Sequence, residues 1–304
     1  MTLLIALILD AIFGEPKQIW DKITHPAVLM GRILDFSDRA FNQGEYKRVK
    51  GTILIATLCI IAFILGSIIS RLPDFGILEI LCVAVLLAHR SLVDHVKDVA
   101  AALTVSTNEG RRAVSMIVGR DTSTMDQSDI SRAAIESAAE NFSDGVIAPA
   151  FWFSVAGLPG ILIYKFVNTA DSMIGHLTPK YKEFGWAAAR LDDVLNWIPA
   201  RLTGALFCIV SMNNSTWATM SQDAQYHRSP NAGWPEAAMA GTLDIALSGP
   251  RTYEGVQTDD PFVNVAGRHE IALQDIDRAI QVLWKAWGTF AILVLMVALI
   301  AKIL

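Results

Sequence analysis

The longest apolar stretches of the chain have the length of membrane-spanning helices. The run 52–70 contains no charged residue, and the run 286–301 lies between Lys285 and Lys302. About 20 apolar residues in a helix cross the ~30 Å of hydrocarbon in a bilayer. Further candidate spans that carry charged residues are 1–14 with Asp10, 72–88 with Glu79, and 194–212 with Arg201. The pattern predicts an all-α, polytopic integral membrane protein.

Two apolar runs are predicted to be broken or re-entrant helices. The run 146–164 contains "GLPG" at its centre, and the run 194–212 contains Pro199 and Arg201. Proline and glycine interrupt a helix, and non-helical backbone at membrane depth is tolerated only against protein or a wet cavity. No alternating pattern is long enough to predict a sheet.

Basic residues predict the orientation of the chain. Seven of them precede the run 52–70, which places that loop in the cytoplasm by the positive-inside rule: Lys17, Lys22, Arg32, Arg39, Lys47, Arg48 and Lys50. We expect one membrane-embedded helical domain over 1–304, with cytoplasmic polar loops at 89–145, 165–193 and 213–283.

Composition agrees with a membrane location. The chain of 304 residues is 53% hydrophobic and only 18% charged, against about 25% charged in soluble domains. Its net charge of −5 argues against nucleic acid as a partner. Cys59, Cys82 and Cys208 lie in apolar runs without metal-binding spacing, so we interpret them as buried hydrophobic residues.

A row of carboxylates precedes the broken apolar run. Glu136, Glu140 and Asp144 are spaced by four residues, which places them on one face of a helix. Ser128 or Asp129 is the expected N-cap of that helix. Asp171 and the pair Asp192–Asp193 follow further along the chain. The residues alone leave two interpretations open, a metal–phosphate site and polar packing at the membrane edge.

Cations are interleaved with these carboxylates. Arg120, Lys165 and Arg190 are candidate clamps for an anion, since arginine binds phosphate bidentately. His227 stands beside the turn-rich "SPNAG" segment, in which Ser229 and Asn231 could present polar groups to an anion. The chain has no P-loop, nucleophile elbow or zincin motif.

Six segments in order resemble one membrane enzyme family. They are "HPAVLMGRIL", "GRDTSTMD", "ESAAENFSDGVIAPAFWF", "VNTADSMIGH", "FGWAAARLDDVLNWIPARLTG" and "SPNAGWPEAAMAGTL", which run from about residue 25 to 255. Together they resemble the adenosylcobinamide-phosphate synthases, the CbiB/CobD family of cobalamin biosynthesis. Asp244 departs from the apolar, glycine-rich segment that the resemblance leads us to expect there.

The resemblance implies a ligase of the cell membrane whose active site faces the cytoplasm. Adenosylcobyric acid would be joined through an amide bond to (R)-1-amino-2-propanol phosphate or ethanolamine phosphate, with ATP as a substrate and Mg²⁺ as cofactor. Membrane lipid surrounds such a protein, and a second copy or other enzymes of nucleotide-loop assembly are its candidate protein partners.

The implied reaction assigns roles to the candidate residues. We expect catalysis to involve Glu140, Asp144 and Asp171. The metal ligands would be Glu136, Glu140, Asp144, Asp192 and Asp193. The substrate and phosphate would be bound by Arg120, Asn141, Lys165, Asn168, Arg190, His227, Ser229 and Asn231.

Two alternatives remain open at this point. Acidic clusters beside spans also suit a Mg²⁺-dependent intramembrane transferase of another phosphorylated substrate. A transporter or membrane sensor of related fold would be a non-enzymatic alternative.

Overall fold

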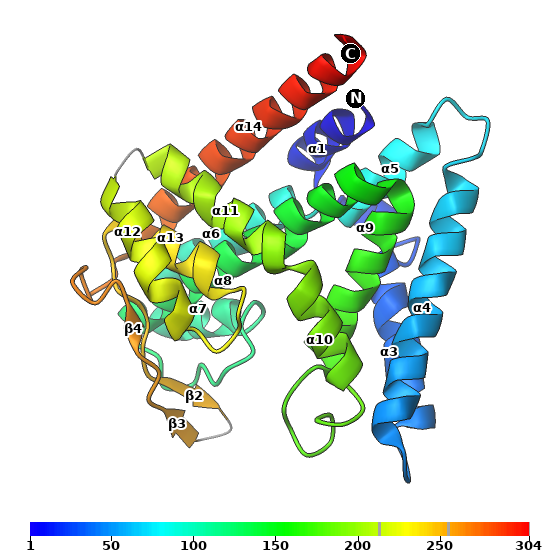
Figure 1. The fold of residues 1–304 in the computed structure, drawn as a ribbon. Coiled ribbons are helices and arrows are strands. Elements are labelled where there is room, and N and C mark those ends of the chain that lie inside the picture. The colour runs from blue at the N-terminus through cyan, green and yellow to red at the C-terminus, as the bar shows by residue number, and fades with distance from the viewer. Residues whose placement is uncertain (212–213, 254–255, 304) are drawn as a thin grey trace. The chain divides into compact units, whose positions relative to one another are not determined.

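The chain is an all-α membrane protein. The computed structural model describes residues 1–211, 214–253 and 256–303, and 74% of the chain is helical. Figure 1 shows the order of the helices along the chain. The contacts within the chain divide the protein into two compact units, each made of two separate stretches. Unit 1 consists of Met1–Ala88 and Asp144–Trp197, and unit 2 consists of His89–Ser143 and Ile198–Leu304. The single embedded domain stays a prediction.

Unit 1 is built around the long helix α9. Its helices are α1 (Thr2–Phe13), α2 (Lys17–Trp20), α3 (Pro26–Phe41), α4 (Lys47–Ile69), α5 (Ile77–Leu86), α9 (Ala148–Ile174) and α10 (Trp186–Leu195). The helices α3, α4, α5 and α10 all pack on α9, and Figure 1 shows α3, α4 and α9 side by side. Tyr164, Val167 and Leu195 belong to the core between α9 and α10.

The predicted break in α9 is present. Ala156 and Gly157 leave the helical region, Gly157 with a φ of 63°, and Pro159 follows within the helix. Glycine adopts this positive φ without the steric cost that other residues have. The neighbouring helix approaches the break closely, because a Cβ added to Gly66 of α4 would lie 2.6 Å from the backbone nitrogen of Pro159.

Unit 2 contains the polar helices and the strands. Its helices are α6 (His89–Val105), α7 (Thr107–Val114), α8 (Gln127–Phe142), α11 (Trp197–Ser211, from Ile198 on), α12 (Asn214–Asp223), α13 (Gly233–Leu243) and α14 (Leu273–Ile303), with a 3₁₀ turn η2 (Ala224–Tyr226). Strand β1 (Leu247–Ser248) pairs antiparallel with β4 (Phe262–Val263), and β2 (Arg251–Tyr253) pairs with β3 (Val256–Thr258). Strands of two or three residues are too short to show an alternating pattern.

Helix α8 begins earlier than expected. Its N-cap is Asp126, whose side chain accepts a hydrogen bond from the Asp129 N–H, while the Asp129 side chain accepts one from the Asp126 N–H. The prediction of Ser128 or Asp129 as N-cap was therefore wrong, because the reciprocal capping box forms three residues apart. Helix α8 continues through a π-helical turn, η1 (Ser143–Ile147), into α9.

The polar segments between the predicted spans contain helices, as expected for the stretch that holds Glu136 and Glu140, and short strands. Residues 89–145 hold α6, α7 and α8, residues 165–193 hold the end of α9 and most of α10, and residues 213–283 hold α12, α13 and the strands. Their cytoplasmic placement stays a prediction.

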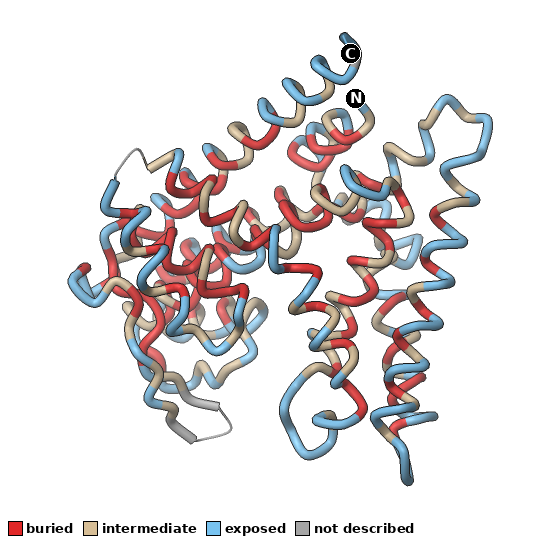
Figure 2. The backbone as a smooth tube through the Cα atoms, viewed as in Figure 1, coloured by how far each residue is buried: buried red, intermediate tan, exposed pale blue. Residues whose placement is uncertain are grey.

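Three helical stretches among the described residues are long and apolar enough to cross a membrane. They are Lys47–Ile69, Gln127–Ile174 and Leu273–Ala301, and the bent pair of α10 and α11 would be a fourth. Figure 2 shows long exposed stretches along α4 and along the end of α14. The exposed residues on both helices are largely apolar, including Ile60 and Phe63 on α4 and Ile292 on α14. Such surfaces fit contact with lipid.

Two predicted spans are shorter than expected. The run 72–88 forms only the ten residues of α5, because Asp74 accepts hydrogen bonds from the N–H groups of Gly76 and Leu78 and closes a turn before the helix. The N-terminal run forms the twelve residues of α1, which packs against α5 within unit 1.

Candidate functional site

Unit 2 gathers two arginines on one buried glutamate. Glu136 of α8 is 6% exposed. It accepts hydrogen bonds from Arg120 Nη2 at 2.5 Å, from Arg251 Nη2 at 3.1 Å and from the Ser248 N–H at 2.7 Å. The side chains of Arg120 and Arg251 are themselves only 9% and 12% exposed. A buried carboxylate requires such compensation, so each member of this cluster depends on the others.

A second buried glutamate contacts Arg251. Glu236 of α13 is 3% exposed, and its Oε1 lies 3.3 Å from Arg251 Nη2. Burial, together with the smaller effect of nearby Glu136, raises the pKa of Glu236 to about 8 against the opposing effect of Arg251. The contact with Arg251 stabilises the charged form of Glu236 by less than burial destabilises it. We therefore expect Glu236 to be largely protonated at neutral pH.

His227 completes this group. Its Nε2 lies 3.4 Å from Glu236 Oε2, and its Nδ1 accepts a hydrogen bond from the Ser229 N–H. Burial lowers the pKa of His227, while Glu140 acts to raise it and Arg251 to lower it. A neutral His227 with its proton on Nε2 fits both contacts.

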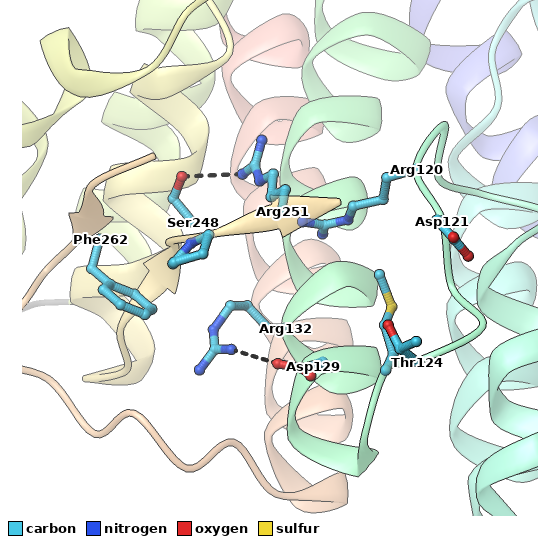
Figure 3. A pocket seen from close by; sticks show the side chains of 10 residues that line it. Arg120, Asp121, Thr124, Asp129, Arg132, Ser248, Arg251 and Phe262 are labelled. Atoms are coloured by element: carbon cyan, nitrogen blue, oxygen red, sulfur yellow. Dashed lines mark hydrogen bonds and ion pairs between the residues drawn. The ribbon is translucent and has the colours of Figure 1, made fainter. Parts of the chain in front are cut away.

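Two cavities border this cluster. The larger has a volume of about 320 Å³ and is shown in Figure 3. The smaller, of about 150 Å³, is lined by Glu136, Glu140, Asn141, His227 and Glu236 among others. Both are lined by Arg120 and Arg251. The guanidinium groups of Arg120 and Arg251 therefore line both cavities.

The other predicted residues of unit 2 take different positions. Glu140 is exposed, although it lies one helical turn from buried Glu136. Asn141 donates to Ser137. The Ser229 hydroxyl accepts from the N–H groups of Asn231 and Ala232, which holds the turn before α13. Asn231 is buried, and its Oδ1 lies 3.5 Å from Arg201 Nη1.

Unit 1 contains a separate polar network. Asn168 of α9 donates to Asp144 Oδ2 and to Asp192 Oδ1, both at 3.3 Å. Asn196 donates to Asp192 Oδ2 at 2.9 Å, and the Tyr164 hydroxyl donates to Asn196 at 3.0 Å. These amides supply hydrogen bonds to the carboxylates and no opposite charge.

The remaining predicted residues of unit 1 surround this network. Half-buried Lys165 interacts electrostatically with Asp144, Glu15 and Asp10. Asp193 forms an ion pair with Arg190 at 3.1 Å and interacts electrostatically with Asp171.

The predicted metal ligands do not form one cluster. Among the described residues, no three His, Cys, Asp or Glu side chains are arranged to hold a metal ion. Glu136 is also occupied by two guanidinium groups. Asp144 and Asp192 share one amide, and such a pair fits Mg²⁺ when substrate phosphates supply further oxygens. The metal role stays a prediction.

Sequence reasoning missed several members of both groups. Arg251 and Ser248 follow α13 in the glycine-containing segment "LSGPR", and Glu236 stands inside the apolar sequence "WPEAAMAG". A single charge in an apolar helix signals a buried ion pair, and this signal could have identified Glu236. Asn196 and Tyr164 carry no such signal, because amides and tyrosines are common in ordinary packing.

Comparison with known proteins gives one consistent family. The sequence model of the CobD/Cbib protein family matches residues 3–283. Proteins named cobalamin biosynthesis protein CobD are 48% identical in Sinorhizobium fredii, over 96% of this chain and 94% of the relative, and 48% identical in Rhizobium meliloti, over 96% and 95%. The Rhodobacter capsulatus protein of that name is 44% identical over 86% of each chain. No solved structure matches. This chain therefore belongs to the CobD/Cbib protein family.

Proposed function

We propose that the protein acts in cobalamin biosynthesis as an adenosylcobinamide-phosphate synthase. It would join a carboxylate of adenosylcobyric acid to the amine of (R)-1-amino-2-propanol phosphate or ethanolamine phosphate, with consumption of ATP. The family and the names of the relatives support the pathway. The observation that supports this reaction is the buried pair of Arg120 and Arg251 on Glu136. Both reactants of amide formation, the acyl phosphate of the corrin and the aminoalcohol phosphate, carry phosphate that guanidinium groups can bind.

The proposed reaction has two steps. The corrin carboxylate attacks the terminal phosphorus of ATP, which forms an acyl phosphate and releases ADP. The amine nitrogen, after loss of its ammonium proton, then attacks the acyl carbon, the C–O bond breaks and phosphate leaves. Mg²⁺, when bound, would neutralise phosphate charge.

Residues of unit 2 suit the handling of these anions. Arg120 and Arg251 are fixed by Glu136 before any ligand arrives, so little reorganisation is needed when charge develops. Glu140 is the exposed carboxylate at the smaller cavity and is placed to accept a proton from an ammonium group.

Sidedness is part of the proposal. The substrates are cytoplasmic metabolites, so the reacting groups should face the cytoplasm. Single cysteines at positions 122, 178 and 229, in a background without native cysteines, should resist an impermeant thiol reagent in intact cells and react in inverted vesicles. Labelling from outside at 178 or 229 would contradict a shared cytoplasmic face.

The reaction itself is tested with purified protein. Incubation with adenosylcobyric acid, ATP, Mg²⁺ and each aminoalcohol phosphate should give adenosylcobinamide phosphate by mass spectrometry, with one ADP per amide. A product without the amide, or transport of a substrate without turnover, would favour the transferase or the transporter alternative instead.

A further inference from the structure

The larger cavity of unit 2 combines cations and anions. It is lined by Arg120, Asp121, Thr124, Met125, Asp129, Arg132, Ser248, Pro250, Arg251 and Phe262. Figure 3 shows the arginines drawn with Ser248 around this space and Arg132 joined to Asp129. All the lining residues belong to unit 2, so the cavity is complete within one compact part of the chain.

The three arginines are held firmly. Arg132 is 13% exposed as a side chain and pairs with Asp129 at 3.2 Å. It also donates to the carbonyl oxygens of His269 at 2.5 Å and Ala246 at 3.2 Å. Arg120 and Arg251 are fixed by Glu136. Arginines that are positioned by protein partners lose little entropy when they bind a phosphate.

The lining of the cavity carries more cationic than anionic side chains. Three arginines, Arg120, Arg132 and Arg251, and two carboxylates, Asp121 and Asp129, line the cavity. Asp129 pairs with Arg132, while Glu136 and Glu236, outside the lining, pair with Arg120 and Arg251. The remaining carboxylate, Asp121, is exposed in the loop before α8 and binds the Ser123 N–H. The cavity thus has a cationic wall and one exposed anionic group.

Size and lining restrict the ligand further. A volume of about 320 Å³ lies at the lower end for small-molecule sites, which is too small for a corrin. Phe262, Met125 and Pro250 give the lining a small apolar part that suits a short carbon chain.

We propose that this cavity binds a small zwitterion, a phosphomonoester that carries an ammonium group on a short carbon chain. The phosphate lies against Arg120, Arg132 and Arg251, and the ammonium lies toward Asp121. The proposal rests on the proposed function for the identity of the natural ligand, an aminoalcohol phosphate. It adds the location and three residues, Arg132, Arg251 and Asp121, that sequence reasoning did not assign.

The test measures binding to the full-length protein in detergent by isothermal titration calorimetry, without corrinoid or ATP. Ethanolamine phosphate should bind, and ethyl phosphate, which lacks only the amine, should bind about tenfold more weakly. Arg132→Gln should weaken both ligands by tenfold or more. Asp121→Asn should weaken ethanolamine phosphate toward the affinity of ethyl phosphate and leave ethyl phosphate unchanged.

Two further variants test whether changes in affinity arise from this cavity. Arg112→Gln removes an exposed arginine of the same unit that pairs with Glu109, and should leave the affinity for both ligands unchanged. Because Arg132 also donates hydrogen bonds to backbone carbonyls, its loss could disturb the fold as well as the cavity. Thr124→Trp, at an exposed lining position, fills the cavity without removing a charge. It should abolish binding in a protein that elutes as the wild type does.

The outcomes separate this proposal from the proposed function. Unchanged affinity in both Arg132→Gln and Thr124→Trp, or no binding by the wild type, would overturn the cavity assignment even if the amide product forms. Specific binding without any amide product would uphold the cavity and overturn the synthase.

Discussion

The two units hold their carboxylates in opposite ways. In unit 2, guanidinium groups neutralise buried Glu136 and line two cavities. In unit 1, the neutral amides of Asn168 and Asn196 donate hydrogen bonds to Asp144 and Asp192. The first arrangement suits an anionic ligand and the second suits a cation. The comparison predicts that phosphate recognition and any metal dependence belong to different parts of the chain.

The largest expected effect comes from removing the central arginine. Arg251→Gln removes one of the two guanidinium groups on buried Glu136, together with the ionic contact of Glu236. Under the proposed function this guanidinium stabilises phosphate charge during the reaction, and loss of one such donor typically lowers turnover by about a hundredfold or more. The rate is measured by mass spectrometry on protein of normal elution volume. Arg112→Gln is the control, and wild-type turnover by Arg251→Gln would refute the role of the cluster.

A smaller effect is expected from the network of unit 1. Asp192→Asn removes a charge but preserves the shape and part of the hydrogen bonding to Asn168 and Asn196. If this network contributes to Mg²⁺ binding, the Mg²⁺ concentration for half-maximal activity should rise by about tenfold to a hundredfold. Asp35→Asn, at an exposed position of the same unit, should leave it unchanged. An unaltered Mg²⁺ requirement in Asp192→Asn would remove the metal role from this network.

Packing around the broken helix gives a prediction on stability. A Cβ at Gly66 would lie 2.6 Å from the Pro159 nitrogen, and overpacking of this kind costs about 1–3 kcal/mol. Gly66→Ala should therefore lower the thermal midpoint in detergent by several degrees. Gly288→Ala, where no atom lies within 4 Å of the added Cβ, should not lower it. Equal midpoints for both variants would mean that α4 does not pack closely on the break.

The smallest predicted effect concerns pH. Because the pKa of Glu236 is raised to about 8 by burial, its contribution to stability is present at acidic pH and is lost as the pH rises through 8. The lowered pKa of His227 acts in the opposite sense, so its contribution is lost on acidification. The titratable and charged groups that face Glu236 are His227, Glu136, Glu140, Arg251 and Arg120.

The matching variant is Glu236→Gln, which cannot ionise. Its thermal midpoint should approach that of the wild type near pH 5 and exceed it by on the order of 5 °C near pH 9. A constant difference across this range would mean that Glu236 does not change its charge between these conditions.

Much of the fold could be predicted from the sequence, because long apolar runs and helix breakers act locally. The spans within α4 and α14 and the break at "GLPG" follow from composition alone. The shortened run at 72–88 could not be predicted, because a turn closed by Asp74 outweighs its apolar character. The strands have only two or three residues each, too few for an alternating pattern.

The candidate site was predictable in its residue types and not in its grouping. The four-residue spacing suggested that Glu136, Glu140 and Asp144 act together, yet Glu136 is buried, Glu140 is exposed and Asp144 belongs to unit 1. A π-helical turn at Ser143–Ile147 interrupts the regular spacing there. Arg251 and Glu236 reach the cluster from elements that only the tertiary fold brings to α8, so periodicity could not identify them.

The central claim, that the two units divide anion recognition from metal dependence, is tested most directly by steady-state kinetics on two variants side by side. With ethanolamine phosphate and Mg²⁺ varied independently, Arg132→Gln should raise the KM for ethanolamine phosphate about tenfold and leave the Mg²⁺ requirement unchanged. Asp192→Asn should do the reverse. A shift of the same parameter in both variants would contradict the account.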